Sequence, residues 1–216
     1  MLKALILSGS ERGNGIASAV SKRIKVFFSE KGVNSEIISL CHLNYSACNN
    51  CGEGKVSCNY RSSACEKQDD MPEVIKKMIG SDIVVYVCPV HAFGMGHLMQ
   101  IFLERAGVGY LRFTRPLINK IGCPVVIGRK YNLGHVHDQL VNNMLLNRMV
   151  VPGAGFPVLI HGNEETKEIA DPEEKVALEQ LLLRSIEIAN SITACKAECE
   201  RPNERIIKYN YIESFN

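Results

Sequence analysis

Residues 3–18 read KALILSGSERGNGIAS, and this stretch decides the fold. Ala4–Leu7 is a short, unbroken apolar run, typical of a strand that is buried on both faces. The next eight residues, Ser8–Gly15, include three glycines, two serines, an arginine and an asparagine, and a helical apolar pattern follows from Ile16. A strand, a tight polar turn and a helix N-terminus bring unpaired backbone N–H groups and the positive end of a helix dipole together. This arrangement predicts a phosphate site, the alternative being a glycine-rich turn that binds nothing.

The spacing of the glycines separates the kinds of phosphate-binding loop. Gly9, Gly13 and Gly15 fit neither the dinucleotide pattern G-x-G-x-x-G nor the nucleoside triphosphate pattern G-x-x-x-x-G-K-[ST]. No acidic residue ends the second predicted strand, where a dinucleotide fold places one against a ribose hydroxyl. A mononucleotide with one terminal phosphate is therefore favoured. Its candidate ligands in this loop are Ser8, Ser10, Arg12, Gly13, Asn14, Gly15 and Ser18.

Composition and charge narrow the class of protein. With 216 residues, 46% of them hydrophobic, the chain is long enough for one well-buried α/β domain, expected over residues 1–196, followed by a tail over 197–216. A formal charge of +2 argues against nucleic acid or an anionic membrane as the main partner. The first strand starts almost at once, which leaves no room for a signal peptide, and no apolar run approaches the roughly 18 residues of a membrane helix. We expect a cytoplasmic protein.

The periodicity along the chain predicts alternating strands and helices. Strands are expected over 4–7, 33–40, 82–88 and 124–128, with a fifth, broken by Pro152, within 150–160; helices are expected over 16–30, 71–79, 97–106, 135–149 and 172–196. Such alternation implies a doubly wound α/β fold with a five-stranded parallel sheet of order 2-1-3-4-5. Ligands bind such sheets beyond the carboxyl ends of the strands. The glycine-bearing loops after strands one, three and four all lie on that edge.

Four motifs in the same order resemble the flavodoxin-like NAD(P)H-dependent FMN reductases, including the multimeric flavodoxin and iron–sulfur flavoprotein branch. They are GSER at 9–12, CEKQDDM at 65–71, DIVVYVCPVH at 82–91 with FLER at 102–105, and KIGCPVVIG at 120–128. The resemblance covers about residues 1–162. It implies an FMN cofactor, NAD(P)H as reductant, and a homodimer or homotetramer.

The resemblance also assigns residues to the cofactor. Ser10, Arg12, Asn14 and Ser18 would hold the flavin phosphate. The ring and ribityl chain would lie between two further loops, formed by Pro89, Val90, His91, Ala92, Phe93 and Gly94, and by Arg129, Lys130, Tyr131, Asn132 and Gly134. Three positions depart from the family pattern: Ala17 replaces a threonine, His91 a tyrosine, and Met99 a lysine. His91 is the candidate catalytic residue because an imidazole beside the ring could relay a proton or place a charge there; alternatively it only fills the space of the tyrosine.

A polar insertion over residues 41–70 contains five of the nine cysteines, and the last four of these are spaced C-x2-C-x6-C-x6-C. Four thiolates on one loop could hold a [4Fe-4S] cluster or a structural zinc ion. The spacing in iron–sulfur flavoproteins is more compact, and Gly54 stands where their third cysteine would fall, so a loop without metal is equally compatible. The candidate ligands are Cys48, Cys51, Cys58 and Cys65.

Two functions follow from these expectations. The first is an FMN-dependent NAD(P)H oxidoreductase that passes electrons to a small acceptor such as a quinone or a free flavin. The second is an electron-transfer flavoprotein that holds FMN, with or without a [4Fe-4S] cluster, and passes electrons between protein partners. A binding or regulatory domain without turnover is the third alternative.

Overall fold

The computed structural model describes residues 1–48, 67–107, 115–163 and 165–198. The strands are β1 (Lys3–Ser8), β2 (Asn34–Ser39), β3 (Ile83–His91), β4 (Gly94–Met95), β5 (Ile121–Gly128) and β6 (Leu159–His161). The helices are α1 (Ile16–Glu30), the short 3₁₀ helix η1 (Leu40–His42), α2 (Met71–Ile79), α3 (His97–Gly107), α5 (Leu133–Leu146) and α6 (Pro172–Glu198). The main path of the sheet is β2-β1-β3-β5-β6, and all of its pairings are parallel. The predicted fold class is confirmed, and the sheet differs in detail from the prediction by an additional strand, β4, which pairs with β3.

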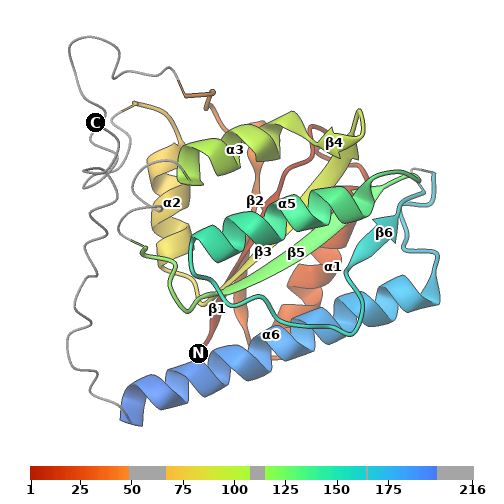
Figure 1. Ribbon diagram of the computed structural model, residues 1–216. Coiled ribbons are helices and arrows are strands. Elements are labelled where there is room, and N and C mark those ends of the chain that lie inside the picture. Colours follow the sequence, from red (N-terminus) through yellow and green to blue (C-terminus); the bar gives the residue numbers. More distant parts are fainter. Residues whose placement is uncertain (49–66, 108–114, 164, 199–216) are drawn as a thin grey trace, which may run out of the picture.

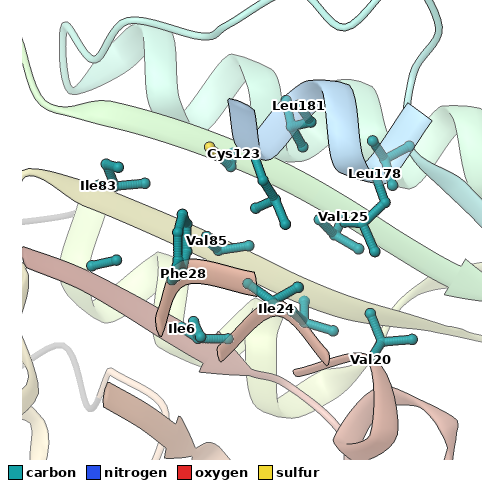
Figure 2. Packing of buried hydrophobic residues seen from close by; sticks show 14 of the residues in the cluster. Ile6, Val20, Ile24, Phe28, Ile83, Val85, Cys123, Val125, Leu178 and Leu181 are labelled. Carbon is teal, nitrogen blue, oxygen red and sulfur yellow. The ribbon is translucent and has the colours of Figure 1, made fainter. Parts of the chain in front are cut away.

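Helices cover both faces of this sheet (Figure 1). On one face, Ile24 and Phe28 of α1 and Leu178 of α6 pack against inward-facing strand residues that include Ile6 and Val85 (Figure 2). On the other face, α2, α3 and α5 pack against the alternate residues of the same strands. The central strands are apolar on both faces because both faces are buried. Each fully buried aliphatic side chain contributes about 1.5–3 kcal/mol.

The third strand is longer than predicted, because it continues through Pro89 to His91 instead of ending at Cys88. Beyond the end of β1 the neighbouring position in the sheet is free, and the chain folds back into it as β4, antiparallel to β3. Proline has no backbone N–H, and the nitrogen of Pro89 faces this side of β3. The proline is therefore tolerated in the strand, and the predicted loop over 89–96 begins as a hairpin.

The strand around Pro124 also starts earlier than predicted, at Ile121. On its outer edge, the Gly122 N–H donates to Val150 O and the Val126 N–H donates to Val158 O. Pro124 lies between these two residues of β5, and its nitrogen takes part in neither bond. The fifth parallel strand, β6, pairs with β5 only from Val126 onward, beyond the proline, and has three residues.

Residues on both sides of 49–66 are anchored on α3. Arg105 Nη1 donates to Ser46 O at 2.7 Å and to Asp69 Oδ2 at 2.8 Å. The ion pair is buried, with side-chain exposures of 2% for Arg105 and 5% for Asp69. The base of the predicted insertion is thus attached to the core, whereas its central part and the tail beyond residue 198 lie outside the described residues.

None of the helices in the described ranges has the length and apolar character needed to cross a bilayer.

Candidate functional site

A cavity of about 370 Å³ lies at the carboxyl ends of β1, β3 and β5. This is the edge at which doubly wound sheets bind ligands. The loops that follow these strands form its walls. Its lining residues are Ser10, Arg12, Gly15, Ile16, Ala17, Pro89, Val90, His91, Ala92, Phe93, Ile127, Gly128, Arg129, Lys130, Tyr131 and Gly162.

The first wall is the loop between β1 and α1. Ser10 is only 7% exposed, and its Oγ accepts a hydrogen bond from the Arg12 N–H at 3.1 Å. Gly15 is the N-cap of α1, and no side chain caps the helix or places a negative charge in its first turn. The unpaired N–H groups and the helix dipole therefore face an end of the cavity that also carries Arg12. This wall has the chemistry of an anion site.

Gly9 holds the same loop against α3. Its N–H donates to Val87 O at 2.9 Å, and a Cβ on Gly9 would lie 2.8 Å from Met99 Cβ. Only glycine allows this approach without displacing the helix. Met99 is fully buried in the contact, so the family's lysine position is occupied here by a packing residue.

The second wall is the turn between β3 and β4. Ala92 has a φ of 47° and Phe93 a φ of 63°, so both residues of a two-residue turn have the positive φ that type I′ turns require. Non-glycine residues adopt this conformation at a cost of about 1–2 kcal/mol each. Asn132 Nδ2 donates to Phe93 O at 2.9 Å and so ties the turn to the loop after β5.

The third wall is the loop between β5 and α5, which contributes two cations and an aromatic ring. The rings of Phe93 and Tyr131 lie 5.8 Å apart at 36°, and Lys130 Nζ lies 5.5 Å from the centre of the Tyr131 ring. Phe93 is 63% and Tyr131 58% exposed. Two large aromatic side chains thus stand uncovered beside the cavity.

His91 is held by a carboxylate that the sequence analysis did not identify. Its Nε2 lies 2.9 Å from Glu11 Oε2, and the other oxygen of Glu11 lies 3.1 Å from Nδ1 of His97. His91 lines the cavity. The loop after β1, the end of β3 and the first turn of α3 therefore meet in one cluster of three titratable side chains.

Several lining residues were not predicted: Ile16, Ala17, Ile127, Gly128 and Gly162. The Gly162 N–H donates to Gly128 O at 2.9 Å, and a Cβ on Gly162 would lie 3.1 Å from Ile16 Cγ2. The position of the fifth strand beside the fourth was the signal that could have placed Gly162 here. Ala17, predicted as a departure from the family pattern, is buried in the wall.

Other predicted residues lie outside the lining. Ser8 is buried in β1, Ser18 is on α1, Gly94 is in β4, Asn132 precedes α5 and Gly134 is inside it. Gly13 and Asn14 are exposed in the first loop, with Gly13 close to His42. Their assignment to the cofactor stays a prediction.

The candidate metal ligands differ from the cysteine next to the cavity. Cys48 is exposed and forms no disulfide, while Cys51, Cys58 and Cys65 lie outside the described residues. Cys88, next to the lining residue Pro89, is buried, and burial raises the pKa of its thiol to about 12. Cys88 therefore stays protonated at neutral pH, as a packing residue rather than a nucleophile.

Comparison with known proteins decides the family. The sequence profile described as "NADPH-dependent FMN reductase" matches residues 2–164. The chain belongs to the NADPH-dependent FMN reductase family. It is an FMN-containing oxidoreductase that takes electrons from a nicotinamide nucleotide, which confirms the principal function predicted from the sequence.

The individual relatives have low sequence identity to this reductase. An iron–sulfur flavoprotein of Methanocaldococcus jannaschii is 28% identical over 163 residues, which are 74% of this chain and 81% of the relative. The crystal structure of RosB with 8-demethyl-8-formylriboflavin-5′-phosphate has a TM-score of 0.68 and 17% identity, covering 100% of this chain and 98% of RosB. A flavodoxin from the domain Archaea has a TM-score of 0.54 and 16% identity, covering 89% of this chain and 99% of the flavodoxin. The two structures share the fold.

The cavity fits FMN on two observations. Its volume of about 370 Å³ lies within the roughly 300–1,000 Å³ of cofactor sites. At one end, Ser10, Arg12 and the uncapped N-terminus of α1 provide donors and positive charge for a single phosphate.

Proposed function

We propose that this reductase passes its electrons to a small planar acceptor such as a quinone or a free flavin. The observation that carries the proposal is the combined site, in which a phosphate-type cradle and two exposed aromatic rings border the same cavity. When bound, FMN supplies the hydride chemistry. The residues of the chain bind the cofactor, orient it and leave one side of the site open to a second ligand.

Each wall has its own part in this proposal. Arg12, Ser10 and the first-turn N–H groups of α1 hold the phosphate. The turn at Ala92 and Phe93 and the loop at Arg129–Tyr131 border the ring-binding part of the cavity. Glu11 fixes the orientation of His91, so that its imidazole can hold or deliver a proton at the cavity wall.

Anaerobic mixing of the FMN-loaded protein with NADPH or NADH tests this function. Rapid loss of the flavin absorbance at about 450 nm, followed by its return when a quinone is added, is the expected result. Reduction by dithionite but by neither nucleotide would instead identify an electron carrier. His91→Phe, which keeps a ring but removes the nitrogens, should slow the quinone-dependent return more than the nucleotide-dependent loss.

The second candidate function is that of an electron-transfer flavoprotein with a [4Fe-4S] cluster. The similarity to the iron–sulfur flavoprotein of Methanocaldococcus jannaschii favours it, together with the four candidate cysteines of the insertion. Iron and acid-labile sulfide near four atoms each per chain, in protein prepared without oxygen, would support it. Absence of both would reject the cluster, and zinc in their place would assign a structural metal.

Assembly and location belong to the same proposal. We infer a homodimer or homotetramer in the cytoplasm, as the family resemblance implies for the assembly and as the sequence analysis expects for the location. Light scattering on the FMN-loaded protein measures the assembly directly, and a monomer at all concentrations would refute it.

A further inference from the structure

The cavity has more positive charge than one flavin phosphate requires. Arg12, Arg129 and Lys130 line it, and none of the lining residues in the described part of the chain is an aspartate or glutamate. A phosphate monoester carries between about one and a half and two negative charges at neutral pH. One phosphate beside Arg12 therefore leaves much of this positive charge uncompensated.

The surplus charge comes from a different loop than the phosphate cradle. Arg12 follows β1 and the pair Arg129 and Lys130 follows β5, with β3 between the two strands. The three cations therefore reach the cavity from two separate loops. Neither Arg129 nor Lys130 has a carboxylate partner among the residues that the structure describes.

The exposed aromatic pair lies beside these cations, with Tyr131 on the same loop and Phe93 on the turn between β3 and β4. Phe93, Arg129, Lys130 and Tyr131 are here called the rim. Phe93 and Tyr131 expose more than half of their surface next to the cavity, although burial of such rings is favourable. The Asn132 hydrogen bond to Phe93 O joins the two loops, so the rings are placed before any ligand arrives. Lys130 lies 5.5 Å from the Tyr131 ring, which puts a cation beside a stacking surface.

We propose that the rim selects an aromatic acceptor that carries an anionic group (sulfonate, phosphate or carboxylate) over a neutral acceptor. The ring of the acceptor stacks at Phe93 and Tyr131, and its anionic group is bound by Arg129 and Lys130. The proposal rests on the reductase function proposed above and names the class of acceptor for the same site.

The test compares two quinones on the full-length, FMN-loaded protein. We would measure kcat/KM for 1,4-naphthoquinone-2-sulfonate and for 1,4-naphthoquinone at one NADPH concentration, per bound flavin, and use the ratio of the two values. In the double variant Arg129→Gln/Lys130→Gln this ratio should fall about three- to tenfold, as expected for two exposed ion pairs. The matched control, Lys22→Gln/Lys25→Gln, removes the same charge from exposed positions of α1 and should keep the wild-type ratio.

A binding measurement separates the rim from turnover. The dissociation constant of 2-naphthalenesulfonate, which accepts no electrons, should rise by a similar factor in the double variant, and in the wild type it should rise with salt. An unchanged ratio of the two kcat/KM values would overturn the proposal. So would a loss of activity that both quinones share equally, or one that arises only from a weaker reaction with NADPH. A protein that reduces neither quinone but binds the sulfonate through Arg129 and Lys130 would refute the acceptor function and leave the anion-binding rim intact.

Discussion

Glu11 Oε2 lies 2.9 Å from His91 Nε2, and the same carboxylate reaches His97 Nδ1 at 3.1 Å through its second oxygen. One side chain from the loop after β1 thus holds a cavity residue of β3 and a residue at the start of α3. A carboxylate that orients an imidazole affects catalysis without touching the reacting atoms. Glu11 is therefore a positioning residue for His91.

The change Glu11→Ala tests this role. Because His91 loses its anchor, the quinone-dependent turnover per bound FMN should fall by about tenfold. His97→Ala is the matched control, since it leaves the Glu11–His91 contact in place and should have a much smaller effect. Glu11→Asp should recover part of the loss. Equal turnover in the Glu11→Ala variant and the wild type would show that Glu11 does not position His91.

Arg12 is expected to contribute directly to FMN affinity. Loss of a charge-assisted contact to phosphate costs about 1.5–3 kcal/mol, so Arg12→Ala should weaken FMN binding by roughly ten- to a hundredfold. Titration of FMN into the apoprotein, followed by the flavin fluorescence, measures this. Arg23→Ala is the control. Arg23 is an arginine of the following helix, α1, and forms its ion pair with Glu179 of α6. Equal affinities in the two variants would contradict the assigned cradle.

The sequence predicts the strand order and the three cavity loops because both depend on local patterns. Apolar runs identify strands that are buried on both faces, and glycines after those strands mark close approach at one edge of the sheet. The hairpin at β4 could not be predicted in this way. It forms because β1 ends at Ser8 and leaves free the position that Gly94 and Met95 occupy beside β3.

The residues missed in the site share a different cause. The Glu11–His91–His97 cluster joins three segments whose side chains meet only in the folded chain, and no spacing in the sequence records that contact. Gly162 reaches the cavity because β6 lies beside β5, although only three residues of β6 pair there. In contrast, His91 itself was identifiable, because it ends the motif DIVVYVCPVH at 82–91.

Gly9 should not tolerate a side chain. A Cβ at this position would lie 2.8 Å from Met99 Cβ, which belongs to a buried residue and cannot move without shifting α3. Gly9→Ala should therefore lower the free energy of unfolding by about 1–3 kcal/mol, measured by urea denaturation. Gly134→Ala is the opposite case: the new Cβ meets nothing within 4 Å at a helical position, so it should be neutral or stabilising by up to about 1 kcal/mol.

The ion pair between Arg105 and Asp69 should matter more than an exposed one. Both side chains are buried, and removal of one partner leaves an uncompensated charge in the core. Asp69→Ala should cost about 3–5 kcal/mol of unfolding free energy in urea denaturation. Glu179→Ala, which breaks the half-exposed pair with Arg23, should cost less than about 1 kcal/mol. Similar losses of unfolding free energy in both variants would show that burial does not decide how much these ion pairs contribute to stability.

His137 should make the protein less stable in acid. Burial lowers the pKa of His137 below its usual value, although the neighbouring Asp138 acts in the opposite direction. The unfolded chain, in which histidine titrates near about pH 6.5, therefore binds more protons than the folded chain as the pH falls. The unfolding free energy of the wild type should therefore decrease as the pH falls from 8 towards 5.

The variant His137→Gln has no proton to gain at this position, so its stability should decrease less over the same pH interval. Parallel curves for the two proteins, measured by urea denaturation at each pH, would show that His137 does not contribute to the acid sensitivity.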